Sequence, residues 1–227
     1  MTLCLQILFF YAEHVTLDTI ILLVIQVNRQ KEVVPINMLF LDVETGGLNP
    51  ETDALLTVHM SLRNPELEEL KFLDLKVHPG HRAINPRALM VNKIDMDEHC
   101  QSSVHPHIAA QEALSFIRQC KAVTTGGMPI VGHHVQFDIA FMCQLIPNFK
   151  SSYDRNTIDT RVLATLMRVC GAIDTPDATL QSTRLALGIG SAEDAHTARG
   201  DVESCVGIIK HLFGQLVTVK EKGFARL

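Results

Sequence analysis

The chain opens its main ordered region with three short apolar runs, Met38–Val43, Ala54–Leu62 and Leu70–Val77. Each run has the length of a β-strand and is bounded by turn-forming residues. Asn64 and Pro65 lie between the second run and the third and are typical of a turn. The pattern therefore predicts a meander of three strands.

Further along, short strands alternate with segments whose apolar residues have helical spacing. The expected strands are Pro129–Val131 and Asn156–Asp159, and the expected helices are Ile108–Lys121, Val135–Ile146, about Thr160–Val169, Thr179–Leu187 and Ala198–Val219. Strands first, followed by strands alternating with helices, are typical of an α/β domain. We expect a mixed central β-sheet flanked by α-helices.

Residues 1–37 form an apolar N-terminal extension outside this pattern. Polar residues between positions 13 and 18 interrupt it, so no stretch reaches the roughly 18 apolar residues of a membrane span. No Lys or Arg precedes Arg29, and a signal peptide needs a basic start. We predict no membrane contact and a folded domain at 38–227. The extension has three open interpretations: an element packed on the domain, a contact in a possible homodimer, or a segment upstream of a natural start at Met38.

Composition limits the classes of function. The 227 residues are 47% apolar, enough for a buried core, and 20 basic against 25 acidic residues give a net charge of −5. A broad basic face for long duplex nucleic acid is therefore not expected, and any nucleic-acid contact must be local. The six cysteines show no zinc-type spacing and are typical of reduced thiols, which favours a cytoplasmic protein.

Candidate chemistry lies at the ends of the predicted elements. Asp42 and Glu44 are two residues apart on a strand, so both carboxylates leave the same face and can converge. A divalent cation would offset their repulsion and their desolvation. Asp138 and Asp201 each begin a predicted helix, and His196 precedes Asp201 by five residues. Each acidic residue alone is more often a strand end or a helix cap, but coincidence is a poor explanation for all five.

Three segments together carry a family resemblance: Phe40–Leu48, Gly132–Asp138 and His196–Asp201. Over roughly residues 38 to 212 the chain resembles the DEDDh, or DnaQ-like, 3′-5′ exonucleases. The resemblance implies an RNase H-like fold, in which a three-strand meander plus shorter parallel strands form the mixed central sheet. Two positions depart from the usual motifs. Gly46 stands where the family commonly has Thr, and His134 stands where it commonly has Asn.

The resemblance also implies an activity and a cofactor. Asp42, Glu44, Asp138 and Asp201 would hold two Mg²⁺ or Mn²⁺ ions, and His196 would take the proton of the attacking water as general base. The chain would then be a 3′-5′ exonuclease, a phosphodiester hydrolase that removes nucleoside 5′-monophosphates from the 3′ end of single-stranded DNA or RNA.

Substrate contacts also follow from the resemblance. The backbone around Thr45 would meet the terminal 3′ hydroxyl, and Leu48 would wedge beside the terminal base. Leu48 has an equal alternative as a core residue of its loop. Phe137 and Phe141 are expected in the core, because the chain has few aromatic residues and no Trp. The two departures bear on the shape of this nucleotide pocket.

Two other functions compete with this interpretation. A non-catalytic RNase H-like module that binds nucleic acid or a protein partner would normally lack one of the five site residues. An internally cutting ribonuclease H needs no histidine at position 196. All five residues are present, which favours the exonuclease.

Overall fold

A computed structural model describes residues 36–151, 153, 156–190 and 196–222, and for residues 216–222 it describes the backbone alone. Residues 1–35 of the predicted extension lie outside this set. A five-stranded sheet in the order β3-β2-β1-β4-β5 forms the centre. Its strands are β1 (Met38–Thr45), β2 (Leu55–Arg63), β3 (Glu69–Lys76), β4 (Ile130–Gly132) and β5 (Thr157–Asp159).

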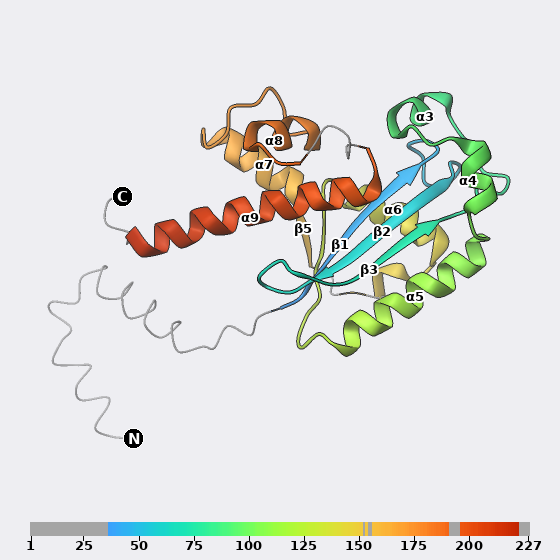
Figure 1. Cartoon of the computed structure of the whole chain (residues 1–227), viewed down its shortest axis with the longest axis horizontal. Helices are drawn as coiled ribbons and strands as arrows, with labels where there is room; N and C mark the ends of the chain where they lie inside the picture. The colour runs from blue at the N-terminus through green and yellow to red at the C-terminus, as the bar shows by residue number, and fades with distance from the viewer. Residues whose placement is uncertain (1–35, 152, 154–155, 191–195, 223–227) are drawn as a thin grey trace, which may run out of the picture. The chain divides into compact units, whose positions relative to one another are not determined.

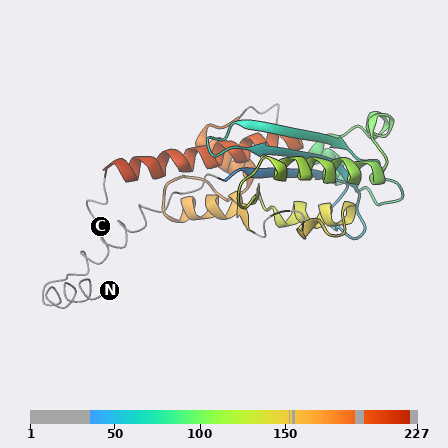
Figure 2. The ribbon, with the colours of Figure 1, turned by 90° about the horizontal axis from the view of Figure 1, so that it is seen from below.

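Helices cover both faces of the sheet. They are α3 (Pro86–Asn92), α4 (Met96–Ser102), α5 (Pro106–Ala122), α6 (Gln136–Leu145), α7 (Thr160–Val169), α8 (Leu180–Leu187) and α9 (Ala198–Lys222), with a short 3₁₀ turn, η1, at Phe149–Ser151. The long helix α9 crosses one face, with α7 and α8 beside it, while α5 and α6 cover the other (Figures 1 and 2). This arrangement confirms the predicted α/β fold.

The side chains of β1 explain why the strand lies in the middle. Leu39, Leu41 and Val43 belong to the core under α5 and α6, whereas Met38 and Phe40 pack under α9. Because successive side chains point to opposite faces, Asp42 and Glu44 continue the α9 face beyond Phe40. The two carboxylates therefore begin where the apolar packing on that face ends.

The sheet topology brings the ends of several elements together. β1 runs antiparallel to β2 and parallel to β4, and β4 runs parallel to β5. Gly132 ends β4 so close to β1 that a Cβ atom there would lie 2.8 Å from the Leu41 carbonyl oxygen. Only glycine permits this approach. The carboxyl ends of β1 and β4 thus meet at one edge, where the loop before α6 begins.

The sequence predicted the larger elements well and missed three small ones. The meander, β4, β5 and the helices α5 to α9 are confirmed, with ends shifted by up to about three residues. The helices α3 and α4 and the turn η1 were not predicted, because each is too short to show a period. The Asn85–Pro86 pair did contain a signal for α3, since Asn85 caps the helix and Pro86 takes its first position.

Two further expectations concern the membrane and the cysteines. Within the described part of the chain, every helix is too short or too polar to cross a bilayer. The five cysteines described, Cys100, Cys120, Cys143, Cys170 and Cys205, are free thiols.

Candidate active site

Three of the predicted carboxylates converge at the end of β1. One carboxylate oxygen from each of Asp42, Glu44 and Asp201 lies within 4.8 Å of the others. Asp42 and Glu44 come from the α9 face of β1, and Asp201 comes from the first turn of α9, which packs on that face. Asp201, at least 157 positions further along the chain, therefore joins the two β1 carboxylates in one oxygen cluster, of the kind that Mg²⁺ and Mn²⁺ prefer.

Asp138 lies next to this cluster but outside the set of three. It sits in the first turn of α6 and is 3% exposed. Its Oδ1 atom accepts a hydrogen bond of 3.0 Å from the backbone N–H of Val43, between the two acidic residues of β1. Asp138 is predicted to be a metal ligand. The structure shows in addition that its side chain binds the backbone of β1, a contact that the sequence did not reveal.

The carboxylates raise one another's pKa values. Burial, followed by the charges of Asp138, Asp201 and Glu44, raises the pKa of Asp42 well above its usual range. Burial and the charges of Asp201 and Asp138 raise the pKa of Glu44 to about 8. Burial also raises the pKa of Asp138, although the Val43 hydrogen bond opposes it. Such a crowded, all-oxygen donor set fits divalent cations, because positive charge would relieve the repulsion.

His196 lies beside Asp201 in a turn before α9. It has a positive φ of 65° and is partly buried. Burial raises the pKa of Asp201, whereas a hydrogen bond from the His196 backbone and the charges of His196 and Arg184 lower it. Arg184 of α8 is 2% exposed and was missed in the sequence, where an arginine in an amphipathic helix carries no sign of burial. The structure thus places His196 and the Arg184 guanidinium near Asp201.

A pocket of about 580 Å³ opens next to the carboxylates. Its lining includes Glu44, Leu48, Arg87 and Phe137. Leu48 is 84% exposed, so the alternative that it belongs to the loop core is wrong. Phe137 is partly buried and packs on the fully buried Phe141, with ring centroids 4.9 Å apart. The expectation of a core residue holds for Phe141, whereas Phe137 forms part of the pocket wall.

Comparisons with known proteins agree with this geometry. No family model matches the chain. The chain is 33% identical over 135 residues to ribonuclease T of Actinobacillus pleuropneumoniae serotype 5b (strain L20), covering 56% of this chain and 60% of that protein. It is 32% identical over 112 residues to ribonuclease T of Shewanella frigidimarina (strain NCIMB 400), covering 47% and 51%. The chain thus spans between about half and 60% of these curated relatives.

Solved structures of exonuclease I share the fold. The E. coli enzyme in complex with a dT13 oligonucleotide superposes with a TM-score of 0.62 at 22% identity, over 80% of this chain and 43% of that chain. Exonuclease I from Methylocaldum szegediense gives a TM-score of 0.65 at 16% identity, over 79% and 41%. These similarities support the resemblance of the chain to the DEDDh exonucleases. The RNase H-like fold that the resemblance implies is confirmed.

The segment Thr45–Gly47 at the end of β1 is held by residues of the unpredicted helix α3 and its N-cap. The Thr45 hydroxyl donates to the Gly47 carbonyl at 2.6 Å. The Asn92 side-chain amide donates to the Thr45 carbonyl at 3.1 Å, and the Asn85 backbone N–H donates to the Gly46 carbonyl at 2.6 Å. The Thr45 hydroxyl proton is therefore engaged within its own loop. Asn85 and Asn92 are positioning residues that only the structure reveals.

Both departures from the DEDDh motifs have a local explanation. A Cβ atom on Gly46 would lie 2.9 Å from the Ala83 carbonyl oxygen, so a larger residue would push away the segment before α3. His134 has a φ of +63°, a conformation that asparagine also tolerates better than most residues. Its backbone N–H donates to Asp159 at 2.9 Å. Neither departure changes a carboxylate of the cluster.

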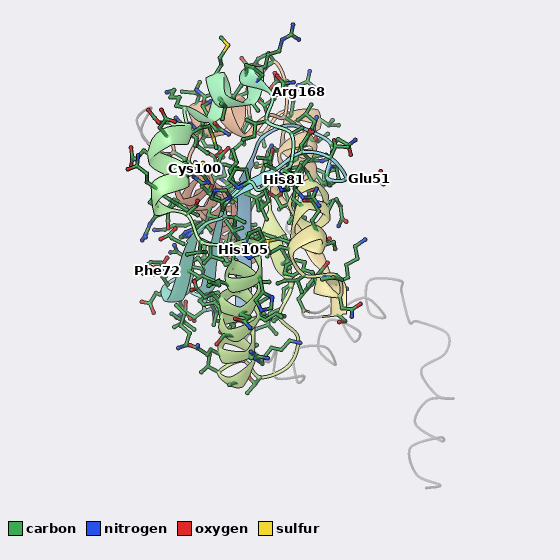
Figure 3. All side chains as sticks on the ribbon, turned by 90° about the vertical axis from the view of Figure 1, so that its right-hand side faces the viewer. Glu51, Phe72, His81, Cys100, His105 and Arg168 are labelled. Carbon is green, nitrogen blue, oxygen red and sulfur yellow. The ribbon has the colours of Figure 1, made fainter. Side chains whose placement is uncertain are left out.

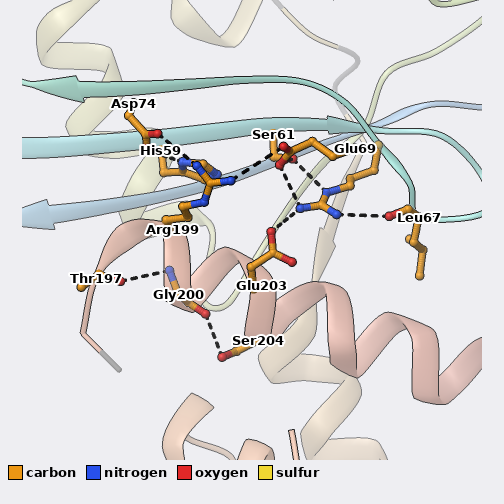
Figure 4. A network of polar contacts seen from close by, with 11 residues as sticks. His59, Ser61, Leu67, Glu69, Asp74, Thr197, Arg199, Gly200, Glu203 and Ser204 are labelled. Atoms are coloured by element: carbon orange, nitrogen blue, oxygen red, sulfur yellow. Dashed lines mark hydrogen bonds and ion pairs between the residues drawn. The ribbon is translucent and has the colours of Figure 1, made fainter. Parts of the chain in front are cut away.

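A second polar network fixes the start of α9 to the meander (Figure 4). Arg63, 7% exposed on β2, donates to Ser61 at 2.9 Å, to the Leu67 carbonyl at 3.2 Å and to Glu69 at 3.0 Å. It also pairs with Glu203 of α9. This guanidinium therefore ties β2 and β3 to the helix that carries Asp201.

Arg199 makes the second attachment of α9. It lies over the Phe72 ring at 4.6 Å from the centroid and pairs with Asp74 at 3.5 Å. Asp74 also contacts Nδ1 of the buried His59 at 2.5 Å. Arg199 and Glu203 are four residues apart and share one side of α9, so Asp201 between them points about 160–200° away from that side. The two attachments thus set the rotation of the helix that presents Asp201.

We expect Arg63→Met to lower the free energy of unfolding by about 2–3 kcal/mol, because Glu69 and Glu203 would lose their shared cation and the Leu67 carbonyl a donor. Urea unfolding measures the change. Lys210→Met, an exposed substitution on the same helix α9, is the matched control and should shift stability by less than about 0.5 kcal/mol. Equal stability of the two variants would contradict the role given to Arg63.

Proposed function

We propose that the chain is a metal-dependent 3′-5′ exonuclease that acts on single-stranded nucleic acid. The observation that carries the proposal is the convergence of Asp42, Glu44 and Asp201, whose oxygens lie within 4.8 Å of one another beside an open pocket. Two comparisons support the substrate class. The similar curated proteins are named ribonuclease T, and the E. coli exonuclease I structure contains a dT13 oligonucleotide.

Asp42, Glu44 and Asp201, with Asp138 beside them, would hold two Mg²⁺ or Mn²⁺ ions. When bound, such ions activate a water molecule and stabilise the charge that develops on the phosphate and the leaving oxygen. The side chains contribute four carboxyl groups fixed by β1, α6 and α9. Because burial and mutual repulsion oppose their ionisation without a cation, a bound cation would stabilise their charged forms.

His196 would act as the general base in this proposal. It lies next to Asp201, and its neutral imidazole would take the proton of the attacking water. Thr45 would meet the 3′ end of the strand through its backbone, and the exposed Leu48 would contact the terminal base. His196→Ala should therefore lower the hydrolysis rate by roughly 10²–10⁴-fold with little effect on metal binding, the usual contribution of a positioned base.

The test uses single-stranded DNA and RNA oligomers, labelled at the 5′ or the 3′ end, with Mg²⁺ or Mn²⁺ and with excess chelator. A ladder that shortens stepwise from the 3′ end, and that disappears with chelator, is the expected result. Internal cuts would replace the proposal with an endonuclease. Intact oligomers that remain bound would replace it with the non-catalytic binding module.

The proposal assigns the activity to residues 38–227. Every proposed ligand lies at or beyond Asp42, and residues 36–227 form a compact unit by themselves. A protein without residues 1–36 should therefore retain metal-dependent hydrolysis in the same ladder assay. A soluble but inactive truncation would contradict this and assign residues 1–36 a part in the fold or in a homodimer. A cytoplasmic location remains part of the proposal.

A further inference from the structure

A second cavity, of about 330 Å³, lies outside the candidate active site. Three histidines and an arginine contribute to its lining: His78, His81, Arg82 and His107. None of its described lining residues is acidic, although the chain carries a net charge of −5. A local group of N–H donors without a carboxylate is unusual on such a protein and favours an anionic ligand. Figure 3 looks onto the side of the molecule where His81 and His105 lie.

The hydrogen bonds fix which atoms can donate into the cavity. The Gly80 backbone N–H donates to Nδ1 of His78 at 3.1 Å, so a neutral His78 carries its proton on Nε2. The Nε2 atom of Gln144, another lining residue, is buried and has no hydrogen-bond partner among the described residues. A buried donor without a partner calls for an acceptor that is not part of the chain.

Arg82 is held in place but not neutralised. Its Nη1 atom donates to the carbonyl oxygens of Pro50 at 3.5 Å and Glu51 at 3.1 Å. No ion pair among the described residues includes Arg82. A guanidinium anchored to neutral carbonyl groups keeps its full charge for a ligand. Phosphate is one of the anions that a guanidinium binds through two parallel hydrogen bonds.

Backbone hydrogen bonds connect a segment that lines the cavity to the loop that lines the active-site pocket. Asp53 lines the active-site pocket and pairs with Ala83, the residue after Arg82. The Ala83 backbone N–H donates to the Thr52 carbonyl, and the Ala83 carbonyl accepts a hydrogen bond from the Ala54 backbone N–H. The loop that carries Leu48 and the segment that carries Arg82 are thus hydrogen-bonded together. A strand whose 3′ end occupies one pocket therefore has the other as a neighbouring surface.

We propose that this cavity is a second phosphate site, which binds a backbone phosphate of the single-stranded nucleic acid away from the end being cut. The inference rests on the proposed function for its ligand. Arg82 supplies the charge, and the imidazoles of His78, His81 and His107 with the Gln144 amide supply further N–H donors. Phosphate contacts of this kind hold a strand without reading its sequence.

Binding of a fluorescent 20-nucleotide single strand, measured by anisotropy in excess chelator, tests the site without hydrolysis. Arg82→Gln and His107→Gln are each expected to weaken binding about 3–10-fold at moderate salt. Loss of one phosphate contact should also lower the slope of log affinity against log salt by about 0.7 in Arg82→Gln. Binding of a dinucleotide should not change, because it is too short to reach both pockets. Arg118→Gln, an exposed arginine of α5 outside the cavity, is the matched control.

Each outcome decides the proposal. Unchanged affinity and salt slope in both cavity variants would overturn it. If Arg82→Gln disturbs the loop at Pro50, the affinity of His107→Gln alone tests the site. Calorimetric titration with inorganic phosphate separates the two sources of the ligand. Phosphate binding lost in Arg82→Gln while 20-mer binding stays unchanged would assign the site to a free phosphate and overturn the nucleic-acid ligand. Because no cleavage is measured, a failed ladder assay refutes the exonuclease without deciding this site.

Discussion

Asp42→Asn is expected to lower hydrolysis by at least about 10³-fold and, without metal, to make the protein more stable than wild type. The activity falls because a neutral amide replaces a ligand of the cluster, and the lost charge stabilisation amounts to several kcal/mol. Stability rises because the wild-type carboxyl is buried among Glu44, Asp138 and Asp201, and the amide removes their mutual repulsion. Rate measurements at saturating Mn²⁺ give the loss of activity, and thermal unfolding in chelator gives the gain of stability.

A matched control separates this effect from removal of any aspartate. Asp95 caps α4 by accepting hydrogen bonds from Asp97 and Glu98, and Asn caps equally well, so Asp95→Asn should change neither activity nor stability by much. An Asp42→Asn protein that is fully active, or that is less stable than wild type in chelator, would contradict the cluster as a repulsive metal site.

The same experiment on Asp138 requires a careful choice of variant. Alanine would remove the charge but also leave the buried Val43 N–H without its acceptor, at a cost of about 1–3 kcal/mol. Asparagine keeps an oxygen for Val43 and removes only the charge. We therefore expect Asp138→Asn to be inactive and folded, and Asp138→Ala to be inactive and less stable.

The metal-free protein is expected to lose stability as the pH rises from 6.5 to 8.5. Glu44 has a pKa of about 8 in the folded protein, above its value of roughly 4.3 in the unfolded chain. A raised carboxyl pKa stabilises the fold fully below the unfolded value, and this contribution is lost as the pH rises toward the folded value. The loss in this interval is about 1–2 kcal/mol. Thermal unfolding in chelator across this range measures it.

Divalent cations should reverse this loss, because they bind the ionised carboxylates. The stabilisation by saturating Mn²⁺ should therefore be larger at pH 8.5 than at pH 6.5. Glu44→Gln is the control: it removes the titrating group and should flatten the pH dependence in chelator. A metal-free protein that gains stability between pH 6.5 and 8.5 would show that Glu44 is ionised at neutral pH.

The fold was largely predictable because its main elements carry strong local signals. β1 to β3 appear as apolar runs separated by turn residues, and α5 to α9 show helical spacing over eight or more residues. The helix α3 shows the limit of this reasoning. Its seven residues give no clear period, and its importance comes from contacts with Thr45 and Gly46, some 40 positions earlier in the chain.

The candidate site was predictable in its residues but not in its contacts. Motifs identified Asp42, Glu44, Asp138 and Asp201, and the structure brings three of them within 4.8 Å. The Asp138–Val43 hydrogen bond and the buried Arg184 depend on tertiary packing, which leaves no periodic or compositional trace in the sequence. The polar contacts that orient α9 depend on packing in the same way.

The wide separation of the cluster along the chain has a consequence for folding. Arg63 and Glu203, which fix the first turns of α9, are 140 positions apart. Asp201 is the last of the four site carboxylates to be synthesised. Contacts between residues so far apart close a long loop, which costs chain entropy, and they form later than local contacts during folding. A nascent chain without α9 can form the meander but presents no complete cluster. The fold thereby delays the assembly of the oxygen cluster until the last helix docks, so an unfinished chain lacks the site to which we assign hydrolysis.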